Sequence, residues 1–176
     1  MGKQALLIVD MQRALFSTPP HEADGLVSRI NDLSSRMRMK QSPVIFVQHC
    51  GPEGDALHPS QPGHALHSEL VVEPGDTMIA KASCDCFLNT SLGSTLADLR
   101  IDEVVITGFA TDFCVDTTVR SSLAHGYTTT VPEDGHTTSD RPYMSASMVI
   151  QHHNFVWANL ISPVGAAHLT SCDAIA

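Results

Sequence analysis

The sequence lacks two features that mark particular classes of protein. No apolar run approaches the roughly 20 residues that a membrane-crossing helix needs, so we expect no membrane-embedded segment. Positive charge is scarce, with 10 Lys and Arg against 19 Asp and Glu and a formal net charge of −9. Because no basic patch offsets this balance, we expect neither a nucleic-acid partner nor a membrane partner.

The sequence also lacks a disulfide framework, an internal repeat and a low-complexity linker. Its five cysteines are an odd number without framework spacing, which favours reduced thiols and a cytoplasmic location. The start of the chain has no separate apolar signal region. Its 176 residues suit one domain with a sizeable core, spanning 1–176.

Short apolar runs alternate with segments of helical spacing along most of the chain. This alternation predicts an α/β fold, a single-domain three-layer sandwich whose mostly parallel, doubly wound sheet carries helices on both faces. Residues 49–75 are rich in Gly, Pro and His and form the longest expected loop. Strands are expected near 5–9, 43–47, 77–80, 103–106 and 127–131, helices over 23–39, 92–99, 112–124 and 142–160, and a further short strand near the end.

Cys114 stands where an apolar strand turns at Thr107–Gly108 and a helix begins close to Thr111 and Asp112, both good N-cap types. A thiol in the first helical turn lies near the positive end of the peptide dipoles, which favours thiolate. The N–H groups of that turn are free to bind an oxyanion. A single unbonded cysteine is more often a small buried hydrophobic residue, so interpreting Cys114 as a reactive thiol requires further evidence.

That support comes from two other strand ends. Asp10 ends the first expected strand, Lys81 ends the third, and Cys114 follows the fourth. In an open α/β sheet, ligands bind outside the carboxyl ends of the strands. Alone, an Asp is usually a turn residue and a Lys usually a solvated charge. Together with Cys114 they predict a reactive site.

These residues sit within three motifs that occur in order between about residue 5 and about residue 160. The chain resembles the isochorismatase-like cysteine hydrolase family, which includes nicotinamidases and N-carbamoyl amide hydrolases. The matching residues are Leu7 to Gln12 with Phe16, then Lys81 with Phe87 and Leu92, then Val105 to Gly108 with Thr111, Cys114, Val115 and Thr118.

The resemblance implies a catalytic triad of Asp10, Lys81 and Cys114. It also implies a non-proline cis peptide bond, by position Phe109–Ala110, and an oxyanion hole formed by the N–H groups of Ala110 and Cys114. The implied chemistry is acyl transfer: Asp10 takes the thiol proton, Lys81 holds the carboxylate, and Cys114 attacks an amide-like carbonyl.

Nicotinamidases of the family bind a metal through an Asp-x-His pair after the second strand. Here that stretch reads Val47-Gln48-His49, so the pair is absent, and we expect no metal and no cofactor. Four histidines of the long loop, His49, His58, His64 and His67, are more simply explained as solvent-facing or as subunit contacts. Candidates for the substrate pocket, with loop or core packing as the open alternative, are Phe16, His49, His67, Phe87 and Phe113.

Three functional interpretations remain open from the sequence. The leading one is a cysteine-dependent hydrolase of a small amide or carbamoyl C–N bond, acting through a thioester at Cys114. The alternatives are an isochorismatase-type vinyl-ether hydrolase and a non-catalytic oligomer that binds a small molecule. The resemblance also implies a homo-oligomer, a dimer or larger.

Overall fold

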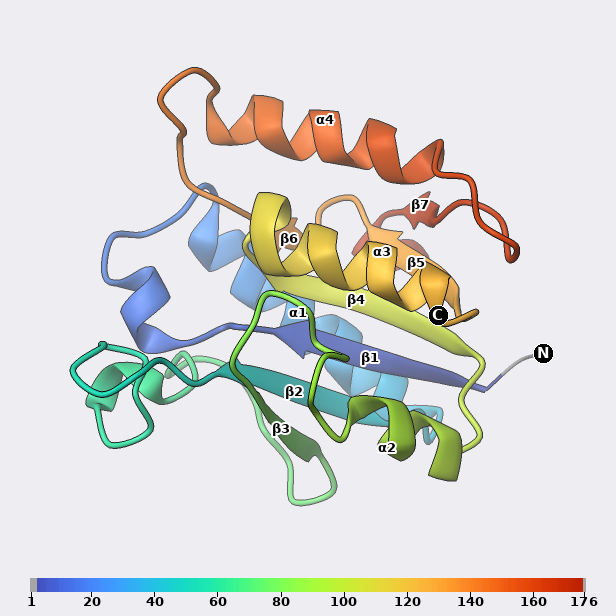
Figure 1. Ribbon diagram of the computed structural model, residues 1–176, viewed down its shortest axis with the longest axis horizontal. Coiled ribbons are helices and arrows are strands. Elements are labelled where there is room, and N and C mark those ends of the chain that lie inside the picture. Colours follow the sequence, from blue (N-terminus) through green and yellow to red (C-terminus); the bar gives the residue numbers. More distant parts are fainter. Residues whose placement is uncertain (1–2, 176) are drawn as a thin grey trace.

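The computed structural model describes residues 3–175; residues 1, 2 and 176 of the domain expected over 1–176 lie outside this range. A parallel sheet is flanked by helices on both faces (Figure 1). The strands are β1 (Gln4–Val9), β2 (Val44–His49), β3 (Thr77–Lys81), β4 (Glu103–Phe109), β5 (Thr128–Pro132), β6 (His136–Thr137) and β7 (His168–Thr170). The α-helices are α1 (Ala23–Met39), α2 (Leu92–Asp98), α3 (Asp116–Ala124) and α4 (Ala146–Ala158).

The strand order is β3-β2-β1-β4-β5-β7, with β6 paired to β4. The chain therefore builds outward from β1 in one direction, then returns and builds outward from β4 in the other. This doubly wound arrangement places a topological switch point between β1 and β4. The predicted fold class is confirmed.

Alternating side chains of β1 divide the core into two layers. Leu6 and Ile8 pack against α1 on one face, whereas Leu7 and Val9 belong to the cluster that includes α2, α3 and Trp157 of α4. Successive side chains of a strand point to opposite faces, so a strand buried on both faces reads as a continuous apolar run. That is why the run Ala5–Val9 predicted a central strand.

Three elements differ from the prediction. β4 continues through Gly108 to Phe109 instead of turning at Thr107–Gly108. The helix expected from 112 opens with a π-helical turn, η3 (Thr111–Val115), and neither Thr111 nor Asp112 caps it. α4 begins at Ala146 rather than 142, because Ser145 adopts the extended conformation of an N-cap and accepts a bond from the N–H of Met148.

Within residues 3–175, no helix combines the length and the apolar character that crossing a bilayer requires.

Candidate active site

The switch point brings the ends of β1 and β4 together. Val9 pairs with Gly108, so Asp10 and the turn that follows β4 leave the sheet side by side. Gly108 has φ of 121°, and a Cβ built there lies 2.1 Å from the carbonyl oxygen of Val9. Only glycine permits this close approach, and the approach sets the position of the segment that carries Cys114.

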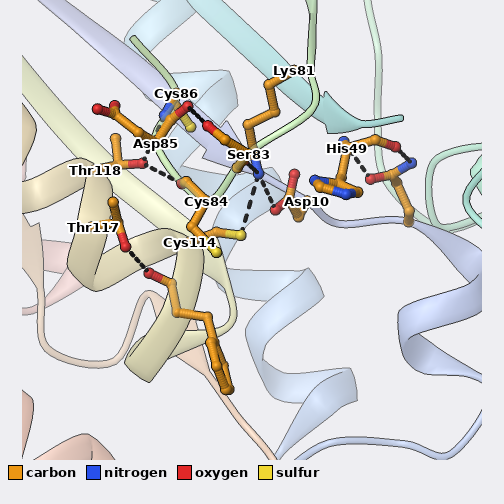
Figure 2. A network of polar contacts seen from close by, with 12 residues as sticks. Asp10, His49, Lys81, Ser83, Cys84, Asp85, Cys86, Cys114, Thr117 and Thr118 are labelled. Atoms are coloured by element: carbon orange, nitrogen blue, oxygen red, sulfur yellow. Dashed lines mark hydrogen bonds and ion pairs between the residues drawn. The ribbon is translucent and has the colours of Figure 1, made fainter. Parts of the chain in front are cut away.

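Lys81 joins the three predicted catalytic side chains. Its Nζ lies 2.7 Å from Oδ2 of Asp10 and 3.2 Å from Sγ of Cys114, and it also donates to the carbonyl oxygen of Ser83 at 2.9 Å (Figure 2). The side chains of Lys81 and Asp10 are 0% and 2% exposed, whereas Cys114 is partly accessible. The carboxylate, the ammonium and the thiol thus meet at the carboxyl edge of the sheet.

Burial is the largest single influence on the pKa values of Asp10, Lys81 and Cys114. It raises the pKa of the Asp10 carboxyl, and the nearby charge of Lys81 offsets this only in part. Although burial disfavours a charged amine, the Asp10 carboxylate raises the pKa of Lys81, which therefore stays protonated. Lys81 and Asp10 form an ion pair, and Asp10 is a stronger base than a solvated aspartate.

The Cys114 thiol differs from the expectation of a stabilised thiolate. Burial raises its pKa, and the Asp10 carboxylate raises it further, against the opposing effect of Lys81. The raised pKa favours the protonated thiol, so an attack by Cys114 would need a base to remove its proton.

The turn after β4, which carries Cys114, is held in place by β6 and α4. The Phe109–Ala110 peptide bond is cis, at the position that the resemblance implied. Oγ1 of Thr111 lies 2.9 Å from Nδ1 of His136, whose Nε2 lies 2.9 Å from Oδ1 of Asn154. Burial lowers the pKa of His136 to about 4, so its ring is neutral and links the turn to α4.

A pocket of about 310 Å³ opens beside Cys114. Of the residues expected to bind substrate, it contains His49 and Phe113. Phe16 and His67 do not line the pocket: their rings pack edge-on at 5.1 Å, and Phe16 also packs at 5.8 Å against Phe109, which does line it. The residues that line the pocket are Asp10, Leu15, His49, Leu57, Cys84, Phe109, Ala110, Phe113, Cys114 and Arg141.

Phe87 does not line this pocket. It is 8% exposed and belongs to the core cluster, where its ring stacks on His125 at 4.6 Å and on Tyr127 at 5.8 Å. The alternative of core packing, which the sequence left open, therefore describes Phe87 better than a place in the pocket.

Arg141, Leu15 and Leu57 line the pocket although sequence reasoning did not single them out, and Arg141 is the charged one. Its guanidinium donates to both carboxylate oxygens of Asp112 at 2.7 and 2.9 Å and to Oγ1 of Thr138 at 2.7 Å, and it lies over the ring of Phe113. Although burial opposes ionisation, bonds from Arg141 and Thr138 lower the pKa of Asp112. Arg141 has no motif around it, so only the path of the chain after β6 reveals its position.

The loop histidines do not converge on one point. His64 lies 3.4 Å from Sγ of Cys50, His58 pairs with Ser60, and His67 packs on Phe16. Among residues 3–175, no group of three or more His, Cys, Asp or Glu side chains is arranged to hold a metal ion.

Known proteins that are similar to this chain include several named as hydrolases. A streptothricin hydrolase of Streptomyces noursei is 36% identical over 143 residues, which cover 79% of this chain and 56% of the relative. A second one from the same organism is 35% identical with 51% of its length covered, so the chain spans about half the length of these curated relatives. A ureidoacrylate amidohydrolase of Pseudomonas syringae is 28% identical, with 69% of this chain and 65% of the relative covered.

Among solved structures, an isochorismatase from Pseudomonas putida KT2440 superposes with a TM-score of 0.90 at 27% identity, covering 99% of this chain and 90% of the other. A sequence profile of the Isochorismatase domain matches residues 4–159, which is most of the chain. The order of the strands, the residues at their carboxyl ends and these matches agree, and the chain belongs to the isochorismatase family.

Proposed function

We propose that this protein is a cysteine-dependent hydrolase that cleaves the C–N bond of a small amide or carbamoyl substrate through a thioester at Cys114. One observation carries the proposal: Nζ of Lys81 contacts both Oδ2 of Asp10 and Sγ of Cys114 at the edge of a pocket. Similarity to a protein named as an amidohydrolase supports the choice of a C–N bond.

In the proposed reaction, Asp10 takes the thiol proton as the sulfur attacks the substrate carbonyl. Lys81 stays charged and stabilises the developing thiolate. The N–H groups of Ala110 and Cys114 bind the oxyanion, and one such donor contributes about 3 kcal/mol in comparable sites. Asp10 then gives its proton to the leaving amine, and water hydrolyses the thioester.

Replacing Cys114 by Ser tests the proposal. We expect turnover in a screen of small amides, followed by ammonia release, to fall on the order of a thousandfold or more, because a serine hydroxyl is harder to deprotonate than a thiol. Mass spectrometry of the native enzyme should find the acyl group on Cys114. The matched control is Cys50→Ser, since Cys50 does not line the pocket and should leave turnover close to normal.

The Cys114→Ser variant also distinguishes amide hydrolysis from the alternative reaction, hydrolysis of a vinyl ether. That reaction protonates a carbon and depends on the acid, so Cys114→Ser should keep much of the activity while Asp10→Asn loses it. Retained amide turnover in Cys114→Ser, or an acyl group on another cysteine, would contradict the proposed role of Cys114.

A further inference from the structure

Two buried polar atoms near Cys114 lack hydrogen-bond partners. Within residues 3–175, the buried side-chain nitrogen and oxygen atoms left unpaired are Oδ1 of Asp10 and Nδ1 of His49. Both residues line the pocket that contains Cys114. Buried polar atoms are nearly always paired, so two unpaired ones on one pocket point to a ligand that bonds to both.

The Asp10 carboxylate has two oxygens with different surroundings. Oδ2 receives the bond from Nζ of Lys81, whereas Oδ1 makes none. In the proposed acylation step, the side of the carboxylate near Lys81 and Cys114 is already occupied. Oδ1 is therefore free to bind a second molecule without disturbing the ion pair.

Gln12 and β3 hold the backbone of His49 in place. The side chain of Gln12, itself 0% exposed, accepts from the N–H of His49 at 2.8 Å and donates to its carbonyl oxygen at 3.0 Å. His49 also pairs in register with Lys81 across β2 and β3. In Figure 2 the imidazole points toward the Asp10 carboxylate.

We infer that Oδ1 of Asp10 and Nδ1 of His49 together bind the water molecule that hydrolyses the thioester. This inference rests on the proposed function and assigns to His49 a role in deacylation. With the ring proton on Nε2, Nδ1 is an acceptor. A water that donates one hydrogen bond to each acceptor keeps its lone pairs free to attack the carbonyl carbon.

The water oxygen forms a bond to the carbonyl carbon, and one water proton passes to Oδ1 of Asp10. The C–S bond then breaks, the acid product leaves, and the sulfur regains the proton from Asp10. Asp10 returns to a carboxylate and Cys114 to a thiol, while His49 orients the water throughout and has no net change in charge.

Burst kinetics with p-nitrophenyl acetate measure the two halves of the reaction separately. The burst of p-nitrophenolate reports acetylation of Cys114, and the steady-state rate reports hydrolysis of the acetyl-enzyme. In His49→Phe, which keeps an aromatic ring but removes the acceptor, we expect a burst amplitude near one per chain and a steady-state rate lowered about tenfold or more. His49→Gln retains an acceptor oxygen and should be intermediate.

Two further measurements complete the test. Mass spectrometry should find acetyl-Cys114 accumulating in His49→Phe, and added hydroxylamine, a nucleophile less dependent on activation, should restore much of its turnover. His58→Gln is the control, because His58 lies in the loop that follows β2 and pairs with Ser60 outside the pocket. The burst amplitude counts acylation-competent chains, so loss of folded protein does not imitate slow deacylation.

An unchanged steady-state rate in His49→Phe would overturn the inference. So would an equal fall in the burst and steady-state rates without acetyl-Cys114, because His49 would then act before the thioester forms. In both cases the proposed function survives if wild-type Cys114 is acetylated. Absence of acetyl-Cys114 in wild type and in every variant would overturn the proposed function and this inference together.

Discussion

In the proposed reaction, Asp10 serves several steps. Its backbone has φ of 51°, a conformation that aspartate tolerates better than most residues, and its side chain is almost completely buried. Burial raises the pKa of its carboxyl, which makes it a better acceptor for the thiol proton of Cys114. The pKa of Cys114 is raised as well, so in the proposed reaction the attacking thiolate forms as Asp10 takes the proton.

This arrangement predicts the acid side of the pH profile for acylation. The step needs ionised Asp10, so the burst rate with p-nitrophenyl acetate should fall as the pH is lowered through the pKa of Asp10. Because that pKa is raised above 3.8, the fall should begin at a higher pH than for an ordinary aspartate. Stopped-flow measurement of the burst rate against pH checks this.

Asp98→Asn provides the control, because Asp98 is an exposed carboxylate on α2 and should leave the acid limb in place. Asp10→Asn should lose most of the burst. An acid limb centred at pH 3.8 or below would show that the pKa of Asp10 is not raised.

Sequence reasoning located Asp10, Lys81 and Cys114 because each lies at or just after the carboxyl end of a strand, where topology alone brings residues together. It could not place Arg141 or Phe87. The direction of a loop side chain depends on contacts between segments far apart in the chain, such as Arg141 with Asp112. A residue type that suits a pocket, as Phe87 does, suits the core equally well.

At the scale of elements, the long apolar strands were predictable, and the junctions between elements were not. β6 has only two residues and therefore no period to detect. The π-helical turn that carries Cys114 depends on its surroundings, including the bond between Thr111 and His136. The extension of β4 through Gly108 depends on the close approach of β1, which no local pattern encodes.

That close approach predicts a large effect for Gly108→Ala. A Cβ at this position would lie 2.1 Å from the carbonyl oxygen of Val9, and φ of 121° is strained for alanine. Because the Val9 oxygen belongs to the backbone of β1 and the Cβ is fixed to the backbone of β4, relief requires the sheet to move. We expect the free energy of unfolding, measured in urea, to fall by about 3 kcal/mol or more.

Gly93→Ala is the matched control. Gly93 lies in α2, and a Cβ there meets nothing within 4 Å. The same substitution should raise the free energy of unfolding by about 0.5–1 kcal/mol, because alanine favours the helix. Equal effects at the two glycines would mean that the approach of β4 to β1 is not constrained by Gly108.

At the scale of the whole molecule, charge is distributed unevenly. Residues 142–172 contain no Asp, Glu, Lys or Arg, although the chain carries 29 such residues and a net charge of −9. This segment includes α4, which lies along the outside of the molecule (Figure 1). Four of its apolar side chains are largely exposed: Tyr143 at 96%, Met148 at 57%, Phe155 at 69% and Ile161 at 100%.

We expect a second copy of this chain to cover the α4 face. Two molecules that each carry −9 repel one another, and the repulsion is weakest where the uncharged segments meet. Met148 and Phe155 are two helical turns apart on the exposed side of α4, so two copies of the helix related by a two-fold axis bring Met148 of each near Phe155 of the other. Such a contact would bury Met148 and Phe155 of both copies.

Light scattering after size-exclusion chromatography tests this at micromolar concentration. Wild type should have the mass of a dimer or a larger assembly with even symmetry, and Met148→Glu should shift it towards the monomer, because the new carboxylate would be buried in an apolar contact. Met39→Glu is the control, since Met39 is 74% exposed on α1 and should leave the mass unchanged. A wild-type monomer, or an assembly that Met39→Glu dissociates and Met148→Glu does not, would rule out α4 as the contact.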